Sequence, residues 1–207
     1  MPVPIFLQGL VIGCSIAAPV GPIGLLCIRR SIVHGRLTGF VSGLGAASAD
    51  ALYGAVAALG LTALMHTLLK FQSSLQLSGG LFLVGLGFTT MHRRAPGPAA
   101  SPDPATNLLA AYLSIFLLTL ANPLTILSFL GIFAGLGLGM GTAGSLAAGR
   151  LVLGVFLGSA AWWLGLSAAA GWLGRRLQPE GLRALNFTSG IVIAGFGGWQ
   201  IVQWLAR

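Results

Sequence analysis

Charged residues are scarce in this chain, and acidic residues are the scarcest of all. Only 7% of the 207 residues are charged, and only three are Asp or Glu. A soluble domain carries about 25% charged residues, so this composition excludes one. Hydrophobic residues make up 56% and form runs long enough to cross a hydrocarbon core, which takes about 20 helical residues. The sequence therefore predicts an all-α integral membrane protein.

Cysteine and histidine are too few and too scattered for redox or metal chemistry. Cys14 and Cys27 lie in the first apolar run, where 13 residues of helix would separate their Cα atoms by about 20 Å. A disulfide holds Cα atoms within about 7 Å, so a membrane thiol oxidoreductase is a disfavoured alternative. His34, His66 and His92 share no spacing and lie at the ends of apolar runs, and we expect no metal site.

Catalytic motifs are absent as well. The sequence has no G-x-x-x-x-G-K-S/T pattern, which excludes ATP hydrolysis by a P-loop. It also shows no pairing of a nucleophile with a base. We therefore expect no enzymatic activity and no cofactor.

Six apolar runs predict six transmembrane helices. No Lys or Arg precedes Arg29, so the first run lacks the basic segment of a cleaved signal peptide and is expected to remain as a helix. The expected spans are Ile5–Ile28, Thr38–Leu64, Ser74–Met91, Leu108–Leu136, Leu151–Leu173 and Phe187–Leu205.

Basic residues lie between the apolar runs. The loops after the first, third and fifth runs hold eight of the eleven Lys and Arg residues. The net charge of +8 thus indicates topology signals beside anionic lipid rather than a nucleic-acid surface. The positive-inside rule places these loops in the cytoplasm and both termini outside, in the periplasm of a bacterium. The eight are Arg29, Arg30, Arg36, Arg93, Arg94, Arg175, Arg176 and Arg183.

A hydrophilic segment with four prolines, residues 92–107, divides the chain into two halves. Its composition predicts a flexible cytoplasmic linker. Residues 1–91 and 108–207 then contain three spans each, and an odd number of spans places the halves in opposite orientations. We therefore expect two inverted three-helix repeats within one membrane domain, as in many secondary transporters.

Prolines interrupt the first span of each half. Proline removes a backbone donor and clashes with the preceding turn, so helices 1 and 4 should break. Freed carbonyls are tolerated inside a membrane where they face protein or a watery cavity, and paired breaks indicate a substrate site. Simple packing kinks are the alternative. The interruptions are AAPVGP, with Pro19, Gly21 and Pro22, and LANPLT, with Asn122, Pro123 and Thr125.

Asp50 is the only acidic residue within an apolar run. An ionised carboxylate there costs several kcal/mol, so such residues usually line a pathway or pair with a partner. We expect Asp50 to couple protons or to meet a substrate amino group; the alternative is a neutral carboxyl hydrogen-bonded to Ser48 or to a neighbouring helix. Alignment of the second spans matches Asp50 with Ser159 and Tyr53 with Trp162, and adds these residues to the expected site.

The spacing G-x-x-x-G recurs in the apolar runs. Small residues at this spacing allow helices to approach closely. We expect these positions to serve helix packing, either within one protomer or across a homodimer. They are Gly9/Gly13, Gly39/Gly43, Gly131/Gly135 and Gly154/Gly158.

These segments resemble the LysE family of amino-acid exporters, within the LysE/RhtB superfamily. The likeness rests on APVGPIGLLCIRRSIVHGRLTGFVSGLGAASADALYG in the first half and TLANPLTILSFLGIFAGLG in the second. It implies proton-driven export of amino acids or related metabolites across the bacterial inner membrane. It also implies a central site formed by Pro19, Gly21, Pro22, Asn122 and Pro123. Many family members have a basic residue after the Asn-Pro pair, where this chain has Leu124.

Two further alternatives stay open. A metal-ion or small-anion exporter of the same superfamily is one, although a single acidic residue and no Cys/His cluster argue against a dehydrated divalent cation. The other is an accessory membrane subunit, which would tolerate replacement of Asp50 and of both proline interruptions.

Overall fold

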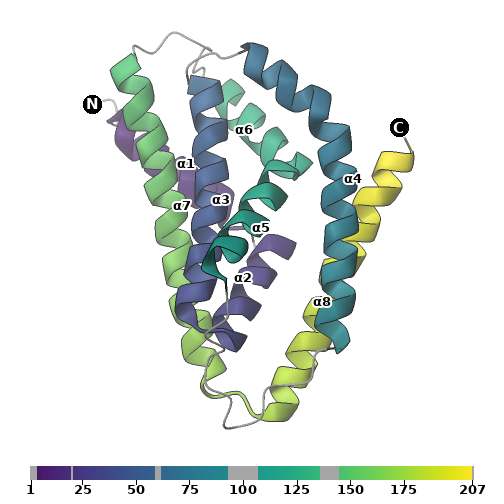
Figure 1. Cartoon of the computed structure of the whole chain (residues 1–207). Helices are drawn as coiled ribbons and strands as arrows, with labels where there is room; N and C mark the ends of the chain where they lie inside the picture. Colours follow the sequence, from purple (N-terminus) through teal and green to yellow (C-terminus); the bar gives the residue numbers. More distant parts are fainter. Residues whose placement is uncertain (1–3, 20, 59–61, 93–106, 136–144, 207) are drawn as a thin grey trace.

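In a computed structural model, the chain is helical throughout the part described, residues 4–19, 21–58, 62–92, 107–135 and 145–206 (Figure 1). The linker expected over residues 92–107 lies almost wholly outside these residues. The helices in the described part are α1 (Ile5–Ala17), α2 (Pro22–Val33), α3 (Arg36–Ala58), α4 (Thr62–His92), α5 (Leu108–Leu120), α6 (Pro123–Gly135), α7 (Ser145–Gly174) and α8 (Pro179–Leu205).

Four continuous helices are long and apolar enough to cross a membrane: Arg36–Ala58, Ser73–His92, Leu146–Gly174 and Glu180–Leu205. A fifth span is possible where α1 and α2 meet at an angle of 83°. The shorter apolar helix α5 is followed, after a two-residue break, by α6. Among the described residues the structure thus shows four or five spans, and the six-span inverted repeat stays a prediction.

Several expected boundaries were wrong. The second span ends at Ala58 rather than Leu64, and residue 64 belongs to α4, which begins at Thr62. The last helix begins at Pro179 rather than Phe187, because proline in the first helical turn loses no internal hydrogen bond. Hydropathy thus placed the end of the second span too late, because the apolar residues after it belong to the next helix, and placed the start of the last helix too late, because its first turns are polar.

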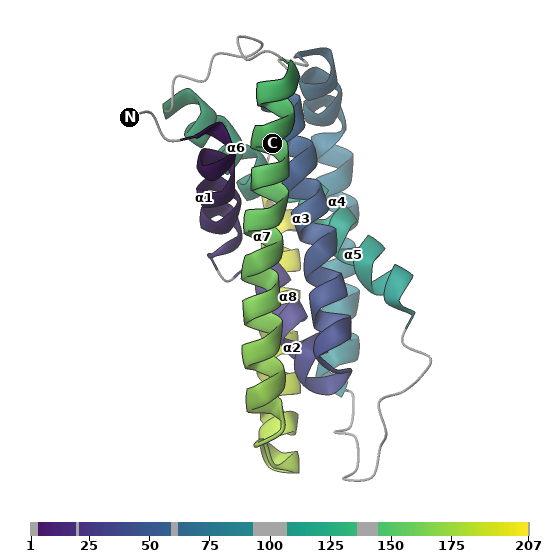
Figure 2. The same cartoon turned by 90° about the vertical axis from the view of Figure 1, so that its left-hand side faces the viewer.

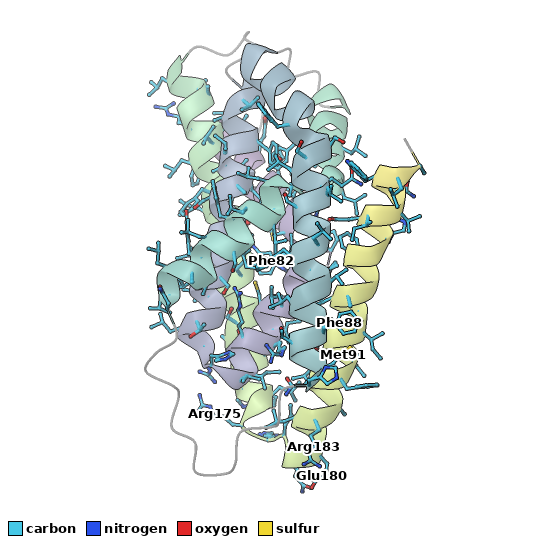
Figure 3. The ribbon with its side chains drawn as sticks, turned by 45° about the vertical axis from the view of Figure 1, so that its right-hand side comes forward. Phe82, Phe88, Met91, Arg175, Glu180 and Arg183 are labelled. Atoms are coloured by element: carbon cyan, nitrogen blue, oxygen red, sulfur yellow. The ribbon has the colours of Figure 1, made fainter. Side chains whose placement is uncertain are left out.

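The helices pack as two groups around α2. Helix α7 packs against both α1 and α3, and α3 in turn packs against α5. Helices α4 and α8 form a second pair, visible beside the first group in Figure 1 and behind it in Figure 2. Helix α2 contacts α3, α7 and α8. The outer faces carry large apolar side chains such as Phe82 and Phe88, which are about half exposed (Figure 3), as suits contact with lipid.

Glycines hold α1 against α7 at backbone contact distance. An added Cβ at Gly9 or Gly13 would meet the carbonyl oxygens of Leu151 and Val155. On the other side of the contact, an added Cβ at Gly154 or Gly158 of α7 would meet backbone atoms of α1. Two of the expected G-x-x-x-G pairs therefore pack against each other within one chain.

The other two glycine pairs behave differently. Gly39 lies against α2 and Gly43 lies against Trp163, so this pair also serves internal packing. Gly131 has nothing within 4 Å of an added Cβ among the described residues, so it packs against no helix of its own chain there, and packing between protomers stays a prediction.

The two arginines at the end of the first span were expected to lie in a loop, and this was wrong. Arg29 and Arg30 lie within α2, and Arg29 is only 3% exposed. The helix resumes at Pro22 after its break and continues to Val33, which carries both side chains into the bundle.

One methyl group added at Gly13 should destabilise the protein, because it would overlap the Val155 carbonyl group. Overpacking of this kind costs about 1–3 kcal/mol. The control Gly165→Ala, on α7 where nothing lies within 4 Å, should be neutral or slightly stabilising, since alanine is the better helix former by about 1 kcal/mol. Thermal unfolding in detergent measures the difference. Equal stability of Gly13→Ala and Gly165→Ala would contradict this packing.

Candidate functional site

The break between α1 and α2 follows from its prolines. Neither Pro19 nor Pro22 has a backbone N–H, so the carbonyl groups four residues earlier, at Ser15 and Ala18, lose their helical donors. The chain turns through a hydrogen bond from Gly21 N to Pro19 O of 2.9 Å. Pro22 then begins α2, as proline does at a helix start.

The break between α5 and α6 is held by side chains. Asn122 Oδ1 accepts a hydrogen bond of 3.1 Å from the backbone N–H of Leu124. That donor is therefore unavailable to the Leu120 carbonyl, which accepts instead from the Tyr53 hydroxyl at 2.7 Å. Tyr53 is buried on α3 and packs on Phe129 of α6. It thus braces the second break from the side.

Asp50 lies in the middle of α3 and is only 3% exposed. Its Oδ2 accepts a hydrogen bond of 2.8 Å from Ser159 Oγ on α7, and Ser159 Oγ accepts one of 3.2 Å from Trp163 Nε1. Ser48 instead donates to the Leu44 carbonyl of its own helix. Of the two partners expected for Asp50, Ser48 or a neighbouring helix, the structure shows the neighbouring helix. Residue 48 points elsewhere because two helical positions correspond to about 200° of rotation.

A cavity of about 80 Å³ joins both breaks to Asp50. This is room for several water molecules. Polar lining groups include the Asp50 carboxylate, Thr119, Asn122, Thr125 and Gln200, and the first turn of α2 forms part of the wall. Apolar walls come from Ile16, Ala17, Pro19, Pro22, Ile23, Ala46, Leu83, Leu118, Trp163 and Phe196, with Gly21 and Gly24.

Most of the residues expected from the sequence come together here. Asp50 and five of the expected break residues, Pro19, Gly21, Pro22, Asn122 and Thr125, line the cavity. The expected Pro123 begins α6, and its side chain lies outside what the structure describes.

Three expected residues lie elsewhere. Ser159 is behind Asp50 as its hydrogen-bond donor, and Tyr53 braces the α5–α6 break. Trp162 does not line the cavity, whereas the next residue, Trp163, does. One residue turns the side chain by about 100° on a helix, and Ser159 and Trp163 share a face at i and i+4.

Sequence reasoning also missed Thr119 and Gln200. Gln200 is 3% exposed, and its Oε1 has no hydrogen-bond partner in the described part of the chain. A buried glutamine in the last apolar run was a usable signal, because unpaired buried amides are costly. Thr119 lies three residues before Asn122, on the same side of the helix end, which is a second signal.

Among the described residues, no group of three or more His, Cys, Asp or Glu side chains is placed to hold a metal ion. The polar atoms that face the cavity are instead one carboxylate, amides and hydroxyls. Such groups suit a small polar molecule, a proton or water.

A multi-pass helical protein with a polar cavity between interrupted helices has the architecture of a membrane transporter. Residues 14–203 match the LysE type translocator family. The chain belongs to this family and is a multi-pass membrane transporter.

Two relatives are similar to this chain. The "Putative amino acid efflux protein YcgF" of Bacillus subtilis (strain 168) is 30% identical over 208 residues, covering 97% of this chain and 98% of the relative. The "Uncharacterized membrane protein YahN" of Escherichia coli (strain K12) is 30% identical over 109 residues, covering 52% and 49% of the two chains. No solved structure matches.

Tyr53→Phe should lower the free energy of unfolding by about 1 kcal/mol, because it leaves the Leu120 carbonyl without its donor. Tyr112→Phe is the control, since Tyr112 stacks on Phe116 and its hydroxyl has no hydrogen-bond partner among the residues described. Thermal unfolding of both variants is the measurement. A Tyr53→Phe variant no less stable than Tyr112→Phe would contradict the bracing role.

Proposed function

We propose that this protein is a secondary active exporter of amino acids or related small metabolites, driven by protons. The observation that supports this most directly is the single cavity that joins both helix breaks to Asp50. The name of the Bacillus relative, which covers nearly the whole chain, points to the same substrate class.

The cavity offers complementary groups for a zwitterion. The first turn of α2 contributes Pro22, Ile23 and Gly24 to the wall, and the start of α6 contributes Thr125. Helix N-termini carry a partial positive charge, which favours a carboxylate. At α6 the N–H groups of Leu124, Thr125 and Ile126 are already bonded to Asn122, so the start of α2 is the better carboxylate site. The carbonyls released by Pro19 and Pro22 and the carboxylate of Asp50 favour an ammonium group.

Asp50 is the group we assign to proton coupling. It is the one carboxylate among the residues that line the cavity. The hydroxyl of Ser159, which donates a hydrogen bond to Asp50 Oδ2, can both donate and accept. Proton binding removes a charge from the cavity. The loss of one charge changes the free-energy difference between the conformation open to the cytoplasm and the conformation open to the outside. Proton coupling requires such a change.

Two features support an inverted repeat. The packing of α1 on α7 is matched by that of α5 on α3, as expected if each half lays its broken span against the second span of the other. Asp50 and Ser159, aligned from the sequence of the two halves, also meet in a direct hydrogen bond. Equivalent residues meet when they lie close to the axis that relates two repeats.

A metal-ion or small-anion exporter of the superfamily is the second candidate. One carboxylate is a poor site for a dehydrated divalent cation, which takes six or more oxygen ligands as calcium does. The peptide-feeding experiment below separates this candidate from amino-acid export, because it measures every metabolite in the medium.

Asp50→Asn should reduce gradient-dependent export about tenfold or more, because it removes the titratable group while keeping the side-chain shape; each tenfold corresponds to about 1.4 kcal/mol. The measurement is untargeted mass spectrometry of the medium around peptide-fed bacteria with and without the protein. Glu180→Gln is the matched control, since Glu180 is exposed at the start of α8.

Ser159→Ala refines the same test. It removes the hydrogen bond to Asp50 but keeps the carboxylate, so export should fall less than in Asp50→Asn. Undiminished export by a folded Asp50→Asn protein would exclude the coupling role. If no amino acid or related metabolite accumulates for the wild type, the proposed function itself is excluded.

We also propose that the protein lies in a bacterial inner membrane with both termini on the periplasmic side. Alkaline phosphatase fused after residue 207 should then be active, and a green fluorescent protein inserted between residues 92 and 107 should fluoresce. Both reporters respond to the compartment that they reach. The reverse pattern would show that the termini face the cytoplasm.

A further inference from the structure

Gln200 is a polar side chain of the Asp50 cavity whose hydrogen-bonding groups are not used by the fold. It lies on α8, is only 3% exposed and lines the cavity. Its side-chain amide forms no hydrogen bond with the residues described, and Oε1 is buried without a donor. By contrast, Asp50 and Asn122, which line the same cavity, each accept a bond within the protein. A buried amide without partners is costly, so packing alone does not account for a glutamine here.

The position of Gln200 is set by α4. Gln76, which is only 1% exposed, donates from Nε2 to the backbone carbonyl of Gln200 at 3.2 Å. An added Cβ at Gly79 would lie 3.8 Å from Gln200 Oε1, so Oε1 is turned toward α4. Nε2, at the other end of the amide, is then the end that can face the cavity, and it carries two N–H donors.

The first turn of α2 lies in the wall of the same cavity, and α2 packs against α8. The residue before Pro22 is Gly21, so no side chain caps this helix start. An added Cβ at Gly21 would meet nothing within 4 Å in the described part of the chain, which shows that there is open space at the helix start. The partial positive charge of a helix N-terminus favours an anionic group in such a space.

Gln200 also differs from the other polar lining groups in where it comes from. Among the described lining residues, α4 and α8 contribute only Leu83, Phe196 and Gln200, so Gln200 is their one polar side chain. The other polar side chains of the lining lie on the helices that face this pair across α2, or on the breaks between them (Figure 1). A molecule bonded to Gln200 would therefore connect the α4–α8 pair to the rest of the bundle.

We propose that Gln200 is a substrate-binding residue that donates from Nε2 to the substrate carboxylate, while the start of α2 attracts the same group. The ammonium group of the substrate then lies toward Asp50. This inference rests on the proposed export of amino acids. It identifies the free carboxylate as the group that the α4–α8 pair recognises.

The test uses everted membrane vesicles with a confirmed proton gradient, acidic inside, whose outer surface is the cytoplasmic side. Mass spectrometry identifies which members of an equimolar mixture of the protein amino acids are taken up, and each is then compared with its carboxamide. The wild type should prefer the acid. Gln200→Leu keeps a similar volume but removes the donor. It should raise the apparent KM for the acid about ten- to hundredfold, the range for a lost hydrogen bond to a charged group, with kcat and the KM for the carboxamide little changed.

Gln200→Glu is a second variant of the same test. It replaces the donor with a group of the same shape that is negatively charged when ionised, and like charges repel. The KM for the acid should therefore rise more than in Gln200→Leu. The control is Gln203→Leu, which changes an exposed glutamine one turn further along α8 and should transport the acid like the wild type.

Thermal unfolding in detergent distinguishes substrate binding from a structural role. Gln200→Leu removes an unpaired buried amide, so the melting temperature without substrate should stay the same or rise. A ligand that binds the folded state raises the melting temperature. The transported amino acid should therefore stabilise the wild type and Gln203→Leu, and it should stabilise Gln200→Leu much less at the same concentration.

Three results would overturn the role of Gln200. An unchanged KM and acid preference in Gln200→Leu, with normal wild-type uptake, would reject it and leave the export function standing. A lower melting temperature of Gln200→Leu, together with an equal rise in KM for acid and carboxamide, would assign the residue to helix packing instead. Absence of wild-type uptake for every amino acid in the mixture would reject the export function and this inference together.

Discussion

Interrupting an apolar helix inside a membrane leaves backbone groups without hydrogen-bond partners. The helices and side chains around each break are arranged to supply those partners. No water is available in the hydrocarbon core, so freed groups must find protein or a water-filled cavity. At the second break, Asn122 and Tyr53 supply the missing partners. At the first break, the prolines release carbonyls beside a polar cavity. The cavity exists where the helices cannot continue.

Close helix contact is what brings the two breaks together. Glycines of α1 and α7 face each other at backbone distance, and Gly80 and Gly87 of α4 do the same with Gly197 and Gly190 of α8. Larger side chains at these positions would push the pairs apart. With little hydrophobic drive between helices in lipid, such packing supplies much of the association energy. The α3–α7 contact that places Asp50 opposite Ser159 has glycines of its own, Gly43 against Trp163 and Gly54 against Val155.

The sequence predicted those features of the structure that a single residue type determines. Proline cannot continue a helix, so both breaks were predictable, and a lone carboxylate in an apolar run identified Asp50. It failed where the outcome depends on rotation about a helix. Trp162 and Trp163 have the same side chain, and only the packing of α7 on α3 decides that Trp163 is the one that lines the cavity. The burial of Arg29 and the partial burial of Arg30 likewise depend on α2 resuming after its break, which hydropathy does not reveal.

A second cavity is lined by Arg30, and the separation of charges between it and the Asp50 cavity bears on how a zwitterion would move. Arg30 and Asp50 have opposite charge when both are ionised. Leu26 lines the cavity at Arg30, Leu83 and Leu118 line the cavity at Asp50, and the three leucines belong to one buried apolar layer. Moving a bare ion through that layer would cost far more than moving a pair of opposite charges together. On the proposed function, a substrate with its own ammonium and carboxylate groups crosses as such a pair. On the same proposal, the apolar layer favours a zwitterion over molecules that carry only one of the two charges.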